Sequence, residues 1–265
     1  MIFIEKQGRF GNFLFQYFFA KYLQKLTNKR IVTFTKNENI YKFNSKKNID
    51  NIIDGYFALP KFSYFLNFWK KKSYYINDEN FQKVLKDEKL QNHSIYYLNG
   101  FFHDIDFINN NIEILSNFIN ENKFSSKNQF IDTDLTIHIR HIHNELGTID
   151  NHIDYKSQPD LEFYIDIIND LKPRRIKLIC SKKTNKIISQ LKNLYKNKIL
   201  IECKDDINDF FNIVYSKNLI ISNSTFSLWG SLLSNSKNIY IPNIGVLQKI
   251  LNKKKLNISS NIIYI

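Results

Sequence analysis

The chain has 265 residues, of which 43% are hydrophobic, and its formal net charge is +13 at pH 7. This length allows one large domain or two smaller ones with a real core, so the chain is long enough to be an enzyme. No stretch reaches the roughly 18 apolar residues of a transmembrane helix. Two distant cysteines, without a secretory pattern at the N-terminus, predict a cytosolic protein. The charge favours polyanionic partners: nucleic acid, an anionic membrane surface or phosphorylated small molecules.

The first half of the chain predicts an α/β domain with a long aromatic helix. Its expected elements are a strand at residues 1–6, a loop at 7–11, a helix at 12–26, and strands at 31–35 and 95–98. No element is assigned in the polar, lysine-rich and aromatic stretch 37–72. Residues 120–128 are rich in Asn and Ser, which is typical of a linker. We therefore expect domains at residues 1–129 and 130–265.

The second half alternates strands with helices. Strands are expected at residues 135–140, 175–180, 198–202, 218–222 and 238–241, and helices at 160–171, 184–195, 207–217 and 225–234. This alternation predicts a mostly parallel sheet with helices on both faces. Ligands of such sheets bind beyond the carboxyl ends of the strands. His138 and Arg140 lie near one such end, and residues 222–225 lie at another.

Residues 138–143 read H-I-R-H-I-H in a chain with only six histidines. Alternate residues of a strand point to opposite faces, so His138 and Arg140 share one face. A metal site is disfavoured because an arginine repels a cation and because the two cysteines lack the spacing of zinc ligands. An arginine fork matches phosphate oxygens, which favours an anion site. A surface histidine cluster without a role remains the alternative.

Two further loops have the composition of ligand-binding turns. Residues 8–12 read G-R-F-G-N between a strand and a helix, where glycines allow a backbone to approach a ligand closely. An ordinary turn between a strand and a helix, without a ligand, is the alternative. Residues 222–225 read S-N-S-T before a helix whose free N–H groups and positive dipole end attract anions. Plain capping of the helix is the alternative there.

Blocks of sequence in the order and spacing of a known family cover nearly the whole chain. Residues 8–20 read G-R-F-G-N-F-L-F-Q-Y-F-F-A and resemble the G-G-L-G-N-Q-M-F-Q-Y-A-x-A of bacterial and animal α-1,2-fucosyltransferases. The first five letters are identical to the G-R-F-G-N of protein O-fucosyltransferases. Residues 97–103 are similar to the family's Y-L-x-G-Y-x-Q, and residues 138–140 to the start of its H-x-R-R-x-D. Residues 209–233 closely resemble D-L-Y-L-M-S-x-C-K-H-x-I-x-x-N-S-S-F-S-W-W-G-A-x-L.

The resemblance implies a fold and an activity. The fold would be α/β of the GT-B type, with two Rossmann-like domains and the active site in the interdomain cleft. The activity would be an inverting transfer of L-fucose from a GDP-sugar to a hydroxyl of a glycan acceptor, which can be lipid-linked, in bacterial surface polysaccharide synthesis. The resemblance implies no metal and no other cofactor. A nucleic-acid partner is not expected.

The resemblance also implies roles for particular residues. Arg140 would grip the diphosphate and stabilise the departing GDP, and Asn12 would face the sugar. His138 would contact the donor nucleotide. The other residues expected to bind the donor belong to the same matched blocks: Gly11, Asp209, Asn223, Ser224, Thr225 and Phe226.

One departure from the family leaves alternatives open. The second arginine and the aspartate of H-x-R-R-x-D are replaced by His141 and His143, so another GDP-hexose or a GDP-heptose is an alternative donor. His143 is the first candidate for the general base, and His103, Asp104 and Glu145 are the others.

Proteins of other classes are also compatible with parts of the sequence. The net charge and the lysine-aromatic stretch 64–75 would suit a nucleic-acid-binding protein. A catalytically inactive module that binds nucleotide sugars would suit the altered loop at residues 138–143. The lysine runs 70–72 and 253–255 could hold an enzyme on the anionic inner face of the cytoplasmic membrane.

Overall fold

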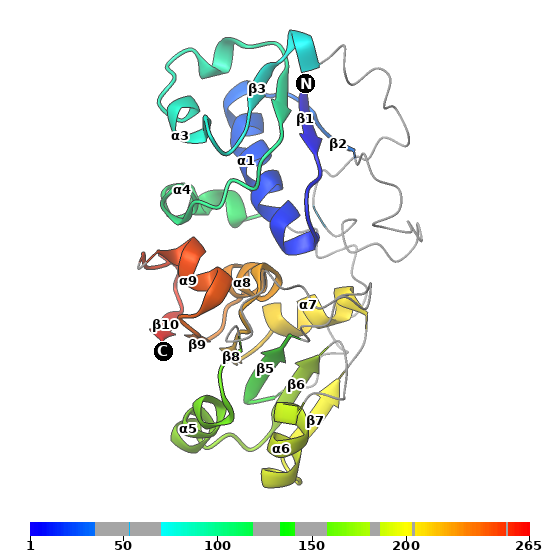
Figure 1. Ribbon diagram of the computed structural model, residues 1–265, viewed down its shortest axis with the longest axis vertical. Coiled ribbons are helices and arrows are strands. Elements are labelled where there is room, and N and C mark those ends of the chain that lie inside the picture. Colours follow the sequence, from blue (N-terminus) through cyan, green and yellow to red (C-terminus); the bar gives the residue numbers. More distant parts are fainter. Residues whose placement is uncertain are drawn as a thin grey trace. The chain divides into compact units, whose positions relative to one another are not determined.

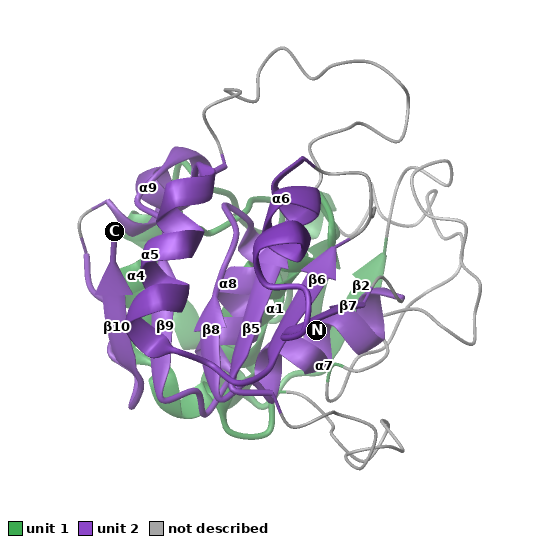
Figure 2. Ribbon diagram, turned by 90° about the horizontal axis from the view of Figure 1, so that it is seen from below, with its two compact units in different colours: residues 1–125 green, residues 126–265 purple. Residues whose placement is uncertain are grey.

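The structure is a computed structural model, and it describes residues 1–34, 53, 70–118, 133–140, 158–180, 186–202, 205–252 and 254–265. The chain divides into two compact units, residues 1–125 and 126–265 (Figures 1 and 2). Each unit contains a parallel sheet with helices, which confirms the predicted α/β class. The predicted domain boundary after residue 129 lies among residues 119–132, outside the described residues.

Unit 1 is built on parallel strands in the order β2-β1-β4-β3. The strands are β1 (Ile2–Glu5), β2 (Ile31–Phe34), β3 (Tyr74–Ile76) and β4 (Tyr96–Leu98). Its helices are α1 (Phe10–Thr27), α3 (Phe81–Val84) and α4 (Ile105–Asn110), with 3-10 turns η2 (Leu90–Asn92) and η3 (Ile112–Leu115).

Helix α1 packs on β1 and β2 and is apolar around most of its circumference. A helix of this kind is stable only when it is buried on several sides. Rings from later segments supply the cover, because Phe19 lies 4.9 Å from Phe81 and 5.0 Å from Phe102 between ring centroids. The helix ends at Asn28, whose φ of 52° is the left-handed conformation common at helix ends.

Unit 2 is built on parallel strands in the order β10-β9-β8-β5-β6-β7, visible across Figure 2. The strands are β5 (Leu135–Ile139), β6 (Ile176–Cys180), β7 (Ile199–Glu202), β8 (Asn218–Ile220), β9 (Asn238–Ile241) and β10 (Asn261–Tyr264). The helices are α5 (Leu161–Leu171), α6 (Lys186–Leu194), α7 (Asp206–Val214), α8 (Thr225–Leu232) and α9 (Gly245–Leu251).

The two faces of the unit 2 sheet are covered differently. Ile137 and Ile139 of β5 share an apolar cluster with Tyr164 of α5 and Leu191 of α6. Helix α7 packs against β5, β6 and α8, and its attachment is polar as well as apolar. Buried Lys177 of β6 donates to Asn212 Oδ1 of α7 at 2.6 Å, and Asn212 Nδ2 donates to Glu202 Oε2 of β7 at 3.0 Å. This buried network fixes α7 on the sheet.

Several predicted boundaries are wrong by a few residues. The loop expected at residues 7–11 ends earlier, because α1 begins at Phe10 and takes Gly11 and Asn12 into its first turn. The helix expected to reach residue 217 ends at Val214, where the Ser216 hydroxyl donates to the Asn212 carbonyl at 2.7 Å. None of the helices in the described part of the chain combines the length and the hydropathy needed to cross a bilayer.

Candidate functional site

The predicted residues of β5 and β8 meet at the carboxyl ends of these neighbouring strands. His138 Nδ1 lies 2.9 Å from the hydroxyl of Ser222, which follows β8. The His138 ring also lies 5.8 Å from the ring of Phe226 in the first turn of α8. The alternation along β5 is as predicted, because Ile137 and Ile139 belong to the apolar cluster on the opposite face. The predicted residues therefore lie together at the strand ends where parallel sheets bind ligands, and their contact with a ligand stays a prediction.

His138 is a neutral group in this environment. Its side chain is buried, and burial, followed by the charge of Arg140, lowers its pKa to about 3. The imidazole is therefore uncharged at neutral pH and bonds to Ser222 as a neutral donor or acceptor. It can contact a nucleotide, but it cannot supply positive charge to a phosphate.

Positive charge at this cluster comes from Arg140, the residue after β5. Its Nη1 donates to the carbonyl oxygen of Asn223 at 3.3 Å, and its own carbonyl accepts from Gln158 Nε2. These contacts direct the half-buried guanidinium toward the loop that precedes α8. A guanidinium held in this way can offer a planar fork of donors to a diphosphate.

Asn223 braces the loop through its side chain. Its Oδ1 accepts from the backbone N–H of Leu247 at 2.9 Å, in the first turn of α9. Gly245 has a φ of +55°, and a Cβ at this position would lie 2.1 Å from Asn223 Nδ2. The side chain of Asn223 therefore holds α9, while its carbonyl holds Arg140. Its predicted contact with a donor remains a prediction.

The start of α8 is capped by serines. Ser224 is the N-cap residue, and its hydroxyl accepts from the N–H of Phe226 at 3.3 Å. Buried Ser227 donates to the carbonyl of Ser222 at 3.1 Å and lies 3.2 Å from that of Ser224. Ser224 therefore caps the N-terminus of α8, as the alternative interpretation predicted. The cap does not prevent an anion from binding at the same helix end. Thr225 and Phe226 are half-buried in the first turn.

Helix α7 joins the same cluster through Phe210. The Phe210 ring lies 5.2 Å from the Phe226 ring, and the preceding residue, Asp209, is buried in the first turn of α7. Five of the predicted donor residues thus belong to one connected group in unit 2. These residues are His138, Arg140, Asn223, Ser224 and Phe226.

Gly11 and Asn12 belong to unit 1, at the carboxyl ends of β1 and β4. Gly8 has a φ of +65°, and a Cβ there would lie 2.7 Å from Asn12 Nδ2, so the turn requires glycine. Fully buried Gln16 of α1 accepts from the N–H of Gln7 at 3.0 Å. It also donates to the carbonyls of Glu5 and Gly100, at 3.1 and 2.8 Å. This side chain ties the loop after β1 to the loop after β4.

The structure describes two of the four candidates for the general base. The other two, His143 and Glu145, lie in residues 141–157, outside the described residues. Asp104 is the N-cap of α4, accepts from the N–H of Phe107 at 2.9 Å, and so has a structural role. His103 packs 4.6 Å from the Phe15 ring, and burial lowers its pKa, which keeps its imidazole neutral and able to accept a proton.

Sequence reasoning missed Gln16, Ser227 and Gly245. A single amide inside an aromatic helix was a usable signal for Gln16, since a buried amide must find hydrogen-bond partners. Gly245 gave no local signal, because its role depends on Asn223. Within the described residues, no group of three or more His, Cys, Asp or Glu side chains has an arrangement that could hold a metal ion.

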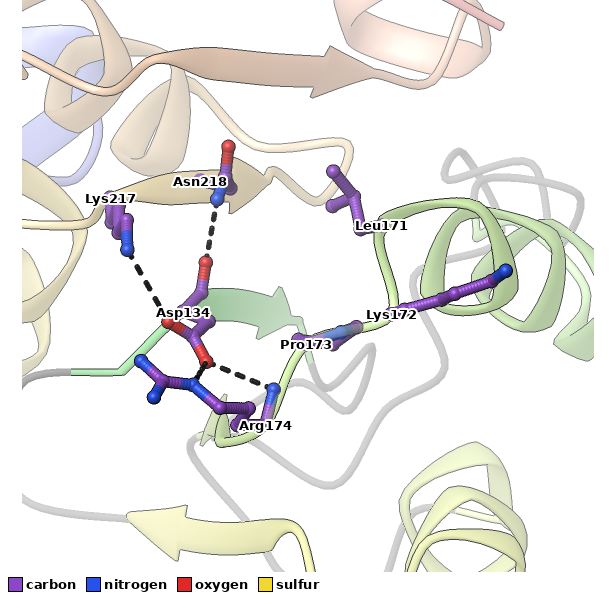
Figure 3. A pocket seen from close by; sticks show the side chains of 7 residues that line it. All are labelled: Asp134, Leu171, Lys172, Pro173, Arg174, Lys217 and Asn218. Atoms are coloured by element: carbon purple, nitrogen blue, oxygen red, sulfur yellow. Dashed lines mark hydrogen bonds and ion pairs between the residues drawn. The ribbon is translucent and has the colours of Figure 1, made fainter.

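A surface pocket of unit 2 lies at the opposite end of the sheet from this cluster. Its lining residues are Asp134, Leu171, Lys172, Pro173, Arg174, Lys217 and Asn218 (Figure 3). They precede β5, β6 and β8 or begin β8, so the pocket is separate from the predicted donor residues.

Comparisons with known proteins show the family of the chain and a similar fold. The profile described as "Glycosyl transferase family 11" matches residues 1–265. A mutant of Arabidopsis thaliana FUT1 in complex with GDP is similar in structure, with a TM-score of 0.57 and 10% identity over 91% of this chain and 70% of that chain. No curated sequence matches the chain significantly.

Two other solved structures cover most of the chain at lower similarity. POFUT1 in complex with GDP-fucose has a TM-score of 0.49 and 12% identity over 89% of this chain and 94% of that chain. The α-1,6-fucosyltransferase NodZ soaked with GDP-fucose has a TM-score of 0.48 and 13% identity over 88% of this chain and 92% of that chain.

Proposed function

Because the chain belongs to glycosyl transferase family 11, we propose that it transfers L-fucose from GDP-fucose to a hydroxyl group of a glycan acceptor. The membership confirms the family that the motifs resemble. The similar structure of Arabidopsis thaliana FUT1 contains GDP, which supports a guanine nucleotide as the carrier of the sugar.

The observation that carries the proposal is the direction of Arg140 toward the start of α8, beside neutral His138. In the transfer, the acceptor oxygen bonds to the anomeric carbon, the bond from that carbon to the GDP oxygen breaks, and the acceptor proton passes to a base. Negative charge develops on the departing diphosphate. Arg140 and the N–H groups of α8 would stabilise that charge without a metal ion.

Inversion at the anomeric carbon follows if one displacement completes the reaction. For the base we retain His143 and compare it with His103, whose neutral ring lies beside the first turns of α1. Asn12 and Gly11, in the first of these turns, would lie on the sugar side. Another GDP-hexose or a GDP-heptose is the second candidate donor, because residues 138–143 differ from the family pattern beside the donor sugar.

The proposed setting is bacterial surface polysaccharide synthesis, such as O-antigen, capsule or lipooligosaccharide. The enzyme would work in the cytoplasm, at the inner face of the membrane, where a lipid-linked acceptor is available. The positive net charge supports this location.

The direct test measures release of the nucleoside diphosphate from GDP-fucose and, in separate assays, from GDP-mannose, a GDP-heptose and UDP-galactose. We expect release from a GDP-sugar, fastest with GDP-fucose, and no loss of rate in EDTA. Arg140→Ala should lower turnover about a hundredfold to a thousandfold. Arg174→Ala is the matched control, since this exposed arginine lies at the opposite end of the sheet. Release from UDP-galactose at the same rate would contradict the proposal.

A further inference from the structure

Four of the turns that lead into the strands of unit 2 are basic and contain no acidic residue. The turns before β6, β7, β8 and β9 read K-P-R-R, Y-K-N-K, Y-S-K and L-S-N-S-K. In each turn the last residue is an exposed lysine or arginine, and these four residues are named here the basic edge: Arg175, Lys198, Lys217 and Lys237. The connection from α9 to β10 adds Lys254 and Lys255.

Backbone hydrogen bonds place the basic edge in one row. The Lys198 carbonyl accepts from the N–H of Ile176 at 2.8 Å, and the Arg175 carbonyl accepts from the N–H of Leu135 at 3.2 Å. On the other side of β5, the Lys217 carbonyl accepts from the N–H of Lys237 at 2.8 Å. Neighbouring strands are about 4.8 Å apart, so the row from β9 to β7 is roughly 19 Å long.

Among the described residues of these turns, one carboxylate lies within the row. Asp134, before β5, accepts from the backbone N–H of Arg174 at 2.9 Å and from Arg174 Nε and Lys217 Nζ, both at 3.4 Å (Figure 3). The backbone N–H of Arg174 and these two cations lower the pKa of Asp134 to about 2. Arg175, Lys198 and Lys237 keep the row strongly positive, and Lys172 and Lys196 extend it in the same turns.

Apolar side chains beside the row favour a lipid surface over nucleic acid. Leu194 ends α6 and is 57% exposed, and Leu200 of the edge strand β7 is 38% exposed. Binding of single-stranded nucleic acid uses exposed aromatic rings as stacking platforms. The tyrosine rings of these turns are packed within unit 2, because Tyr195 packs against the apolar core and Tyr215 stacks on Phe211.

We propose that the basic edge of unit 2 docks on an anionic phospholipid surface. Lysine and arginine would pair with lipid phosphates, while Leu194 and Leu200 would enter the headgroup region. The row lies at the amino ends of the strands, whereas His138 and Arg140 lie at the carboxyl end of β5. The basic edge therefore lies apart from the donor cluster. This docking is independent of the donor chemistry, so its failure and a failure of the proposed function are distinguishable.

Vesicle flotation of the full chain tests the proposal. The vesicles are equal parts of phosphatidylglycerol and phosphatidylcholine, or phosphatidylcholine alone. One variant carries Arg175→Gln, Lys198→Gln and Lys237→Gln. The matched control, with the same net charge, carries three exposed substitutions elsewhere: Lys83→Gln, Lys86→Gln and Lys249→Gln. Near-ultraviolet circular dichroism checks that both variants keep the wild-type fold.

We expect salt-sensitive binding of the wild type to the anionic vesicles only. Each basic residue at an anionic surface contributes about a fivefold factor, so the edge variant should bind about a hundredfold more weakly. The control variant should bind like the wild type. Equal losses in both variants, or no binding of the wild type at low salt, would overturn the proposal. Binding of generic single-stranded RNA that only the edge variant loses, with vesicle binding unchanged, would make the edge a nucleic-acid surface instead.

Discussion

The buried neutral His138 predicts a specific sensitivity of unit 2 to acid. Burial lowers the pKa of this side chain to about 3 in the folded chain, whereas an exposed histidine of the unfolded chain has a pKa near 6.5. Between these two values the unfolded chain carries a proton that the folded chain lacks. Unfolding then takes up a proton, so the free energy of unfolding decreases as the pH falls below about 6.5.

The size of the effect depends mainly on the unfolded pKa. Each pH unit in this window corresponds to about 1.4 kcal/mol, so lowering the pH from about 7 to 5 should cost roughly 2 kcal/mol through this one group. His138→Gln removes the titrating ring and keeps a side chain that can bond to Ser222. The loss between the two pH values should therefore be about 2 kcal/mol smaller in His138→Gln than in the parent chain.

Urea unfolding followed by fluorescence gives these free energies. The chain has two tryptophans, Trp69 and Trp229, and Trp229 is buried in α8, so a Trp69→Phe background reports on unit 2. Ile137→Val, on the opposite face of β5, should cost about 1 kcal/mol at both pH values and is the control for destabilisation alone. If His138→Gln loses as much stability as its parent between the two pH values, His138 is not buried as a neutral group.

Two further substitutions test the supports of the donor cluster. Lys177→Met leaves the Glu202 carboxylate buried without its cation and should cost about 3–5 kcal/mol, much of which Lys177→Met combined with Glu202→Leu should restore. Additive losses in this double-mutant cycle would exclude a coupled pair. Gly245→Ala forces a left-handed alanine against Asn223 and should cost roughly 2–3 kcal/mol in unit 2 and weaken GDP binding. Gln248→Ala, exposed on the same helix, is its control, and equal behaviour of the two variants in urea unfolding would contradict the brace.

The sequence predicts most of unit 2 because its strands are continuous buried runs. Every residue of β5 and β6 is buried. Strands rich in β-branched residues alternate regularly with helical segments, so the hydrophobic pattern predicts both the type and the place of each element. The meeting of His138 with Ser222 follows from this topology alone. The brace from Asn223 to α9 could not be predicted from the sequence, because no helix was expected at α9. The need for glycine at position 245 arises only from its contact with Asn223.

Unit 1 is less predictable because its short elements depend on distant partners. Strand β3 has three residues and no clear alternation, and its cross-strand stack of Tyr75 on Tyr97, at 5.8 Å, joins segments more than twenty residues apart. Helix α4 has six residues, so its capping signal at Asp104 was too brief to indicate a helix. At α1, two glycines suggested a longer loop, but burial of Phe10 begins the helix earlier.

The Lys70–Lys72 run shows the limit of reading charge from sequence. From the sequence, Lys70 and its neighbours could hold the chain on an anionic membrane surface. The Lys70 Nζ lies 4.9 Å from the centre of the Tyr75 ring, where it makes a cation–π contact. Lys71 and Lys72 are exposed, and Lys253 lies outside the described residues. Tertiary packing decides whether a lysine side chain faces solvent or an aromatic ring, and the charge pattern of the sequence does not contain this information.

The affinity of the Arg140 variants for GDP tests the central claim most directly. Calorimetry compares GDP with guanosine for the wild type, Arg140→Lys and Arg140→Ala. If Arg140 grips the diphosphate, Arg140→Ala should lose on the order of a hundredfold in GDP affinity, and Arg140→Lys should lose less because it keeps the charge without the fork. The weaker binding of guanosine should be unchanged in both variants. Wild-type affinity for GDP in Arg140→Ala would show that the diphosphate is bound elsewhere and would contradict the account.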